Sequence, residues 1–318
     1  MGGGCAAALL IYFSSFSGLH AKDEAKAEGA VATRMQNVMF HFTTTSAVHI
    51  KTLRGEIVPT GKNAYPIFDD KESFRVRVSG AEITISATDL ASVLNSYVFA
   101  QSKSPLKLVT AEIVNRKLRI KGKLHDKGDI PFESDGVLSA TPDGKIRLHT
   151  EKIKALKVPV KGLMDTFGID IAKLISSGKL AGVQAEGNDL ILNIAEILPA
   201  PHLDGKVTAI HLEGENIVLI FGTVDGNVKK GPAGNYMSYR GNRLQFGKLL
   251  MSDADMTLID MDSGDPLDFY LDHYKEQLMA GYSKITPSFG LKVFVRDFDK
   301  LGKGRAGKEA GEKPAGRN

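Results

Sequence analysis

The segment 159–175, PVKGLMDTFGIDIAKLI, constrains the fold of this chain more than any other stretch of its sequence. Pro159 suits the first turn of a helix, Gly178 follows its end, and apolar side chains recur at helical spacing between them. These side chains are Val160, Leu163, Met164, Phe167, Ile171, Leu174 and Ile175. A helix with so wide an apolar face needs other elements to cover it, so the pattern predicts a long buried helix.

Most of the remaining chain predicts short strands, because apolar and polar residues alternate along it. The expected strands and hairpins lie around 38–50, 74–85, 106–124, 137–148, 190–198, 207–212 and 217–221. The two hairpins turn at Asn115-Arg116 and at Pro142-Asp143-Gly144, and a helix capped by Ser86 or Thr88 precedes the first of them. One long apolar helix among many strands predicts an α+β fold, with a strongly curved antiparallel sheet wrapped around that helix.

The chain divides into four predicted parts. Residues 1–21 are a predicted signal peptide, 22–222 the curved-sheet domain, 223–301 a smaller C-terminal strand-helix-strand unit, and 302–318 a disordered basic tail. The polar, glycine-rich stretch 223–234 suggests the boundary between the two folded parts. In the C-terminal unit we expect a helix from Pro266, capped by Asp265 and ended by Gly281, and then a strand over 291–295.

The N-terminus predicts export. An apolar run over 5–13 is followed by small residues, although no Lys or Arg precedes it, and the alternative is a disordered or buried N-terminus. Cys5 is the only cysteine, so a processed protein has none. Residues 302–318 hold five basic and two acidic side chains, which accounts for most of the formal charge of +4. The electrostatic case for nucleic acid binding is therefore poor.

The search for reactive chemistry finds no nucleophile elbow, no zinc-protease motif and no cysteine cluster. The most informative feature is an acidic run of Asp253, Asp255, Asp260, Asp262, Asp265, Asp268 and Asp272. Hard cations bind such oxygens, but the run lacks the glycine and glutamate of a calcium loop. We expect a solvated face with helix-capping carboxylates, no metal and no cofactor, and the run leaves a hydrolase as a minor alternative.

A second charged feature is basic. Arg116, Lys117, Arg119, Lys121 and Lys123 alternate with apolar residues along one predicted strand. Such a face can contact anionic lipid headgroups, but the solvent side of an antiparallel sheet is the favoured interpretation. No aromatic residues are interleaved with these charges, which argues against binding of single strands of nucleic acid.

The order of these patterns resembles a known family. The resemblance rests on the segment EITISATDLASVLNS, the strand pairs over 106–148, the helix PVKGLMDTFGIDIAKLI, and the strands LILNIAEIL and VTAIHLEGENIVLIFG. Together they resemble the LmeA-like proteins of bacterial envelopes, which are similar to the tubular lipid-binding (TULIP) fold. The resemblance implies an apolar groove for acyl chains, lined here by Leu163, Phe167, Ile171 and Leu174 of the helix and by Ile191 and Ile194 of the strand that follows.

The sequence therefore leads to one main hypothesis about function. We expect an exported, non-enzymatic protein of the periplasm or cell envelope that binds a phospholipid or another long apolar ligand, with peripheral membrane contact as a further expectation. The alternative is a structural or protein-interaction module of the envelope whose core is fully packed and holds no ligand. An interior void of roughly hundreds of cubic ångströms beside Phe167 separates these two hypotheses.

Overall fold

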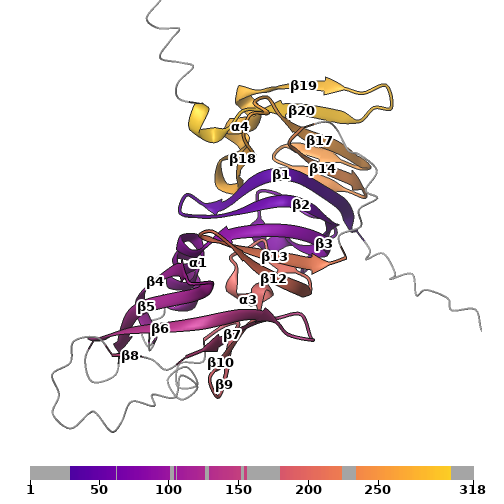
Figure 1. Cartoon of the computed structure of the whole chain (residues 1–318). Helices are drawn as coiled ribbons and strands as arrows, with labels where there is room; N and C mark the ends of the chain where they lie inside the picture. Colours follow the sequence, from indigo (N-terminus) through magenta and orange to yellow (C-terminus); the bar gives the residue numbers. More distant parts are fainter. Residues whose placement is uncertain are drawn as a thin grey trace, which may run out of the picture.

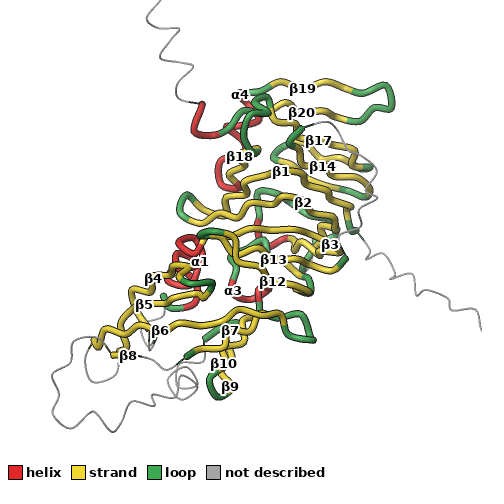
Figure 2. The backbone as a smooth tube through the Cα atoms, viewed as in Figure 1, coloured by secondary structure: helices red, strands yellow, loops and turns green. Residues whose placement is uncertain are grey.

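The computed structural model describes residues 29–61, 63–100, 104, 106–125, 129–151, 154–155, 180–223 and 234–301. These residues form two large sheets and a few short helices, so the fold is mostly β (Figures 1 and 2). The strand-rich, mainly antiparallel part of the predicted α+β fold therefore agrees with the structure, but the strands form two large sheets and not one strongly curved sheet. The long helix over 159–175 lies outside the described residues, as do the predicted signal peptide and the basic tail.

The larger sheet has 11 strands and is mainly antiparallel. Its main path, in spatial order, is β12 (Val207–Glu213), β13 (Asn216–Gly222), β3 (Phe74–Ser86), β2 (Ser46–Pro59), β1 (Val31–Thr43), β14 (Tyr236–Gly241), β17 (Ala254–Asp260), β20 (Leu291–Val295) and β19 (Tyr282–Ile285). Two short strands join it in parallel, β11 (Leu203–Asp204) beside β3 and β18 (Leu267–Tyr270) beside β1. The sheet is open, since β12 and β19 stand at opposite ends of the path.

The second sheet has seven strands and lies below the first in Figure 1. Its order is β4 (Leu106–Val114), β5 (Lys117–His125), β6 (Asp129–Ala140), β7 (Ile146–Thr150), β10 (Asp189–Leu192) and β9 (Val183–Glu186), with β8 (Lys154–Ala155) paired to β6. A separate two-stranded ribbon joins β15 (Leu244–Phe246) to β16 (Leu249–Met251). Both predicted hairpins of this region are confirmed, the β4–β5 pair with positive φ at Asn115 and Arg116.

The described helices are short. They are α1 (Ala87–Val93) with the π-helical turn η2 (Leu94–Val98), α3 (Ile194–Ile197) and α4 (Tyr274–Ala280), with single 3-10 turns η1 (Lys71–Ser73), η3 (Leu271–His273) and η4 (Phe298–Lys300). The Ser86 hydroxyl accepts a hydrogen bond from the amide of Asp89, which confirms Ser86 as the cap of the predicted helix. Figure 1 places α1 and α3 where the two sheets meet.

Three sequence predictions are wrong in detail. The apolar run over 190–198 is not one strand, because Asn193 ends β10 and its side chain caps α3. The helix expected from Pro266 begins only at Tyr274, because the residues before it pair with β1 as β18. The first strand begins before the expected start at Val38, since β1 already pairs with β2 and β14 from Val31. In the last two cases, pairing with β1 outweighs the local pattern.

The larger sheet unites both predicted folded parts. β14, β17, β19 and β20 of the C-terminal part continue the sheet beyond β1 of the N-terminal part. β1 pairs with β14 along its first half and with β18 along its second, and Asn37, with φ of 51°, stands between the two halves. The C-terminal part therefore completes an existing sheet. The division of the chain into a domain of residues 22–222 and a C-terminal unit of residues 223–301 stays a prediction.

Candidate functional site

The first apolar hollow lies over one face of the seven-stranded sheet. Every strand on the main path of that sheet contributes to its wall, and η2 closes one side. The principal lining side chains are Leu94, Val109, Leu124, Phe132, Leu190 and Leu192. Strands of this sheet alternate, so these inward side chains share one face while their neighbours point to the other. An apolar surface built by six strands is suited to a long apolar molecule rather than to polar chemistry.

The second apolar hollow lies between the two sheets. Its walls come from β2, β3 and β13 of the larger sheet, from β6, β7 and β10 of the smaller one, and from α1 and α3. Residues at its walls include Val48, Ile83, Leu138, Ile194, Ile197 and Phe221. The hollow therefore occupies the junction at which α1 and α3 lie in Figure 1.

Leu192 lies in the walls of both hollows. We call the two hollows together the apolar tract. One hollow of the tract lies on the face of the smaller sheet and the other at the junction between the sheets, and Leu192 is the wall residue that they share. A ligand that occupies both hollows therefore contacts this side chain.

The polar groups in the wall are already satisfied. Ser134 and Thr150 are the polar side chains that line the first hollow, and both are buried. The hydroxyl of Ser134 donates to the carbonyl of Glu151 at 3.2 Å, and that of Thr150 donates to the carbonyl of Asn188 at 2.7 Å. Because neither hydroxyl needs a further acceptor, the wall offers a ligand apolar area alone.

The tract is narrow. The cavity volume is about 50 Å³ in the first hollow and about 40 Å³ in the second. A single water needs about 10–15 Å³ of cavity volume, so each hollow has room for a few small groups. A thin methylene chain suits such a space better than a ring system does, and a bulky ligand requires the walls to separate.

The predicted ligand-binding residues differ in their positions relative to the two hollows. Ile194, at the start of α3, lines the second hollow, whereas Ile191 is buried on β10 but lines neither hollow. Leu163, Phe167, Ile171 and Leu174 lie outside the described residues, so their role stays a prediction. The sequence analysis missed the lining residues of β4 to β7. The alternation of apolar and polar residues along these strands is evident in the sequence, but it does not indicate which face of each strand lines a hollow.

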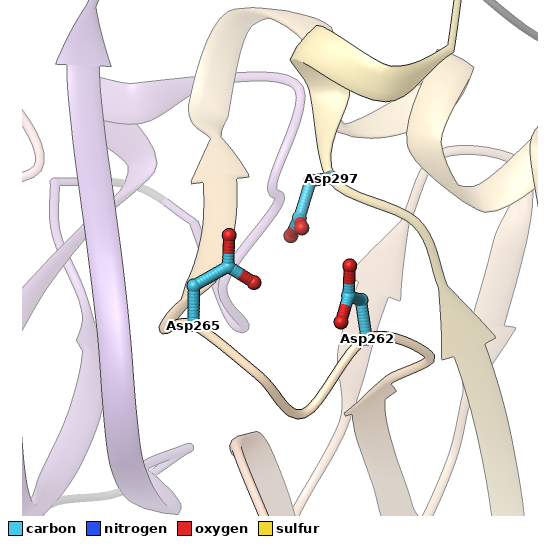
Figure 3. Close-up of side chains that lie close together, drawn as sticks. All are labelled: Asp262, Asp265 and Asp297. Atoms are coloured by element: carbon cyan, nitrogen blue, oxygen red, sulfur yellow. The ribbon is translucent and has the colours of Figure 1, made fainter.

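The acidic run produces a different cluster from the one that the sequence suggests. Carboxylate oxygens of Asp262, Asp265 and Asp297 lie within 4.8 Å of one another, and Figure 3 shows the three side chains pointing together. The ammonium group of Lys300 is bonded to all three, at 2.6 Å from Asp262, 3.3 Å from Asp265 and 2.8 Å from Asp297. This lysine supplies the positive charge that a metal ion would otherwise bring. Asp297 and Lys300, which hold the cluster together, lie outside the acidic run.

Electrostatics support a structural role for this cluster. Asp297 is only 1% exposed, and burial raises its pKa although Lys300 and the amide of Asp268 donate to it. The hydrogen bond from Lys300 lowers the pKa of Asp262, and the carboxylates raise the pKa of Lys300 in return. The buried carboxylate and its lysine therefore join η4 to the loop before β18.

Four other aspartates of the run have separate partners. Asp255 pairs with Arg240, Asp268 with His41, and Asp272 with Lys71. The carboxylate of Asp260 accepts a hydrogen bond from the side-chain amide of Asn235 at 2.8 Å. These partners lie on different elements, so the run does not form one cation site among the described residues.

The basic stripe of β5 is matched by acidic side chains. Arg119 makes two hydrogen bonds to Asp135 on β6, at 2.7 and 3.0 Å, and this contact raises the pKa of Arg119. Lys117 pairs with Glu151, and Lys121 pairs with Glu112 on β4. The stripe is thus part of a charge-balanced outer surface, in agreement with the favoured interpretation of its sequence.

No helix among the described residues is long and apolar enough to cross a membrane. Comparison of the whole chain with protein-family models, with curated proteins and with solved structures finds no match. The apolar tract and the lysine-centred carboxylate cluster are therefore the features from which function must be argued.

Proposed function

We propose that this protein binds a long apolar molecule, such as an acyl chain of a phospholipid, in its apolar tract. The observation that carries the proposal is the pair of apolar hollows that share Leu192 in their walls, with satisfied hydroxyls as the polar part of the first wall. Each buried methylene contributes about 0.8 kcal/mol, so even a partly enclosed chain can bind with useful affinity. The protein itself performs no covalent step in this proposal.

The sequence adds two elements to the proposal. The apolar helix predicted over 159–175 would cover the tract, with Leu163, Phe167, Ile171 and Leu174 toward the ligand, as the resemblance to LmeA-like proteins implies. The larger and smaller sheets would then form a curved wall around that helix. The N-terminal pattern supports export to the periplasm or cell envelope, where such a ligand is abundant.

A substitution at Leu192 tests the proposal. Leu192→Phe places a larger side chain where the two hollows meet, and we expect it to weaken binding of a fluorescent long-chain fatty acid about tenfold, which corresponds to about two displaced methylenes. Val137→Phe is the matched control, because Val137 lies on β6 with an exposed side chain. Equal affinity of the wild type and a folded Leu192→Phe variant would count against the tract as the binding site.

A packed module without ligand is the second candidate, and the narrowness of the tract favours it. The two candidates differ in what Leu192→Phe does to stability. In a ligand-binding tract the larger side chain fills open space and leaves the melting temperature nearly unchanged. In a closed core it overpacks the junction and costs about 1–3 kcal/mol.

A further inference from the structure

The hairpin of β19 and β20 ends in an exposed apolar tip. Phe289 is 91% exposed and Ile285 is 74% exposed, although both are large apolar side chains. Figure 1 shows this hairpin at the end of the larger sheet, with its connecting loop projecting beyond the neighbouring strands. A tip of this kind places about two large apolar groups in contact with water, which is unfavourable unless another phase receives them.

The tip has a defined conformation. Thr286 accepts a hydrogen bond from the amide of Gly290 through its side chain at 2.8 Å, and its own amide donates to the carbonyl of Gly290 at 2.7 Å. Phe289 has φ of 62°, a left-handed conformation that a bulky residue rarely adopts. The turn therefore holds Phe289 outward at some cost, and residues kept in such conformations are often functional.

Two lysines flank the tip. Lys284 and Lys292 lie directly opposite each other on β19 and β20, an arrangement in which like charges repel. Neither makes an ion pair with a described carboxylate, and the Lys284 ammonium lies over the rings of Tyr282 and Phe294 at 5.5 and 5.6 Å. Anionic groups brought to this pair would relieve the repulsion.

The lysine pair belongs to a longer basic row on the outer face of the sheet. Residues in register across β2, β1, β14, β17, β20 and β19 are Arg54, Arg34, Ser238, Thr257, Lys292 and Lys284. The row contains four basic residues, two hydroxyls and no acid. One adjacent row is charge-balanced, since Arg77 pairs with Glu56 and Arg240 with Asp255. A hollow of about 290 Å³ borders the row at Arg34 and Arg54, and Glu56 and Arg77 of the adjacent row line it as well.

We propose that the tip of the β19–β20 hairpin inserts into the surface of a bilayer that contains anionic phospholipids. Lys292 lies three positions after Phe289, or about 10 Å along a strand, so the lysines reach the headgroups when the tip reaches the acyl boundary. Lysines near such a surface each strengthen binding about fivefold, and the exposed aromatic ring adds apolar area. The docking surface is independent of the apolar tract.

The chain contains no tryptophan, which permits a direct test. Phe289→Trp creates a single fluorophore at the tip, and Leu250→Trp creates one at an exposed apolar position on β16 as control. With vesicles of phosphatidylcholine and phosphatidylglycerol, we expect a blue shift and quenching by brominated acyl chains for Phe289→Trp alone. An unchanged spectrum of Phe289→Trp at saturating vesicle concentration would overturn the proposal.

Charge variants test the role of the lysine pair. Lys284→Gln with Lys292→Gln should weaken sedimentation with these vesicles about 30-fold, and Phe289→Ser about tenfold. Lys117→Gln with Lys121→Gln removes the same charge from the ion-paired stripe of β5 and should change binding less than threefold. An equal loss of vesicle binding in the two double-lysine variants would overturn the proposal. Binding of the wild type to single-stranded nucleic acid but not to vesicles would also overturn it. Because Leu192→Phe leaves the hairpin intact, it should retain vesicle binding whether or not the tract holds a ligand.

Discussion

Two buried tyrosines share one aromatic cluster but differ in their hydroxyl contacts. Tyr239 and Tyr274 both pack near Phe68 and Phe246. The hydroxyl of Tyr274 donates to the carboxylate of Asp69, whereas that of Tyr239, which is 1% exposed, has no partner among the described residues. A buried polar group without a partner destabilises the fold, while a bonded one contributes to it.

Removal of each hydroxyl should therefore have opposite effects. We expect Tyr239→Phe to raise the free energy of unfolding by about 1 kcal/mol and Tyr274→Phe to lower it by about 1 kcal/mol. Urea unfolding at neutral pH measures both changes. Destabilisation by Tyr239→Phe would show that its hydroxyl has a partner.

The same tyrosines set an alkaline limit to stability. Burial is the main cause that raises the pKa of both phenols above the ordinary value of 10.0. The folded protein then keeps its phenols neutral while the unfolded chain ionises them, so stability is present below pH 10 and is lost as the pH rises above it. We expect unfolding free energies measured between about pH 8 and about pH 11 to fall less steeply in Tyr274→Phe.

Lys300 permits a test at the carboxylate cluster. Lys300→Met leaves the buried Asp297 beside two exposed carboxylates with no cation. We expect a lower melting temperature at neutral pH and a smaller loss in acid, because protonated carboxyl groups no longer need the lysine. Lys51→Met, which removes an exposed partner of Glu82, should change stability by less than about 0.5 kcal/mol.

At the scale of elements, the β4–β5 turn departs from an ideal sequence at one position. Asn115 and Arg116 have φ of 52° and 61°, and such two-residue turns prefer Asn followed by Gly. Arg116→Gly should therefore raise the melting temperature, by an amount equivalent to about 0.5–1 kcal/mol. Gly144→Ala in the β6–β7 turn should instead lower the melting temperature. The φ of Gly144 is 90°, and a Cβ there would lie 2.6 Å from the side chain of Lys206. A rise for both variants would contradict this account of the turns.

The elements also show what the sequence can and cannot predict. The hairpins at Asn115 and Asp143, the cap at Ser86 and the strand over 291–295 depend on local signals, and the structure confirms each of them. The segment after Pro266 carries a helical pattern, yet it forms β18 because the second half of β1 offers an unpaired edge. That edge depends on residues more than 200 positions earlier in the chain, which a local pattern cannot show.

In the candidate site, too, local features are predictable from the sequence and long-range contacts are not. Apolar alternation along the strands indicates buried faces, and Ile194 lines an apolar hollow, but the lining residues of β4 to β7 depend on how the two sheets meet. The clustering of Asp297 and Lys300 with Asp262 also needs the return of the chain from β20 to the loop before β18.

At the scale of the whole molecule, the larger sheet makes one unit of the predicted curved-sheet domain and the C-terminal part. Removal of residues 223–301 would leave the first half of β1 without β14 as neighbour and would expose its edge. We expect full-length protein to unfold in one cooperative transition, and the truncated chain to aggregate or to lose cooperativity. A soluble fragment that covers 22–222 and unfolds cooperatively would instead support the predicted domain boundary.

The central claim is that the apolar tract holds a long apolar ligand. Native mass spectrometry of the full-length protein, purified without detergent and then mixed with phospholipid vesicles, tests it most directly. We predict a stoichiometric lipid adduct on the wild type that is reduced in Leu192→Phe and retained in Val137→Phe. A protein that carries no lipid after purification and takes none from the vesicles would contradict the claim and favour the packed interaction module.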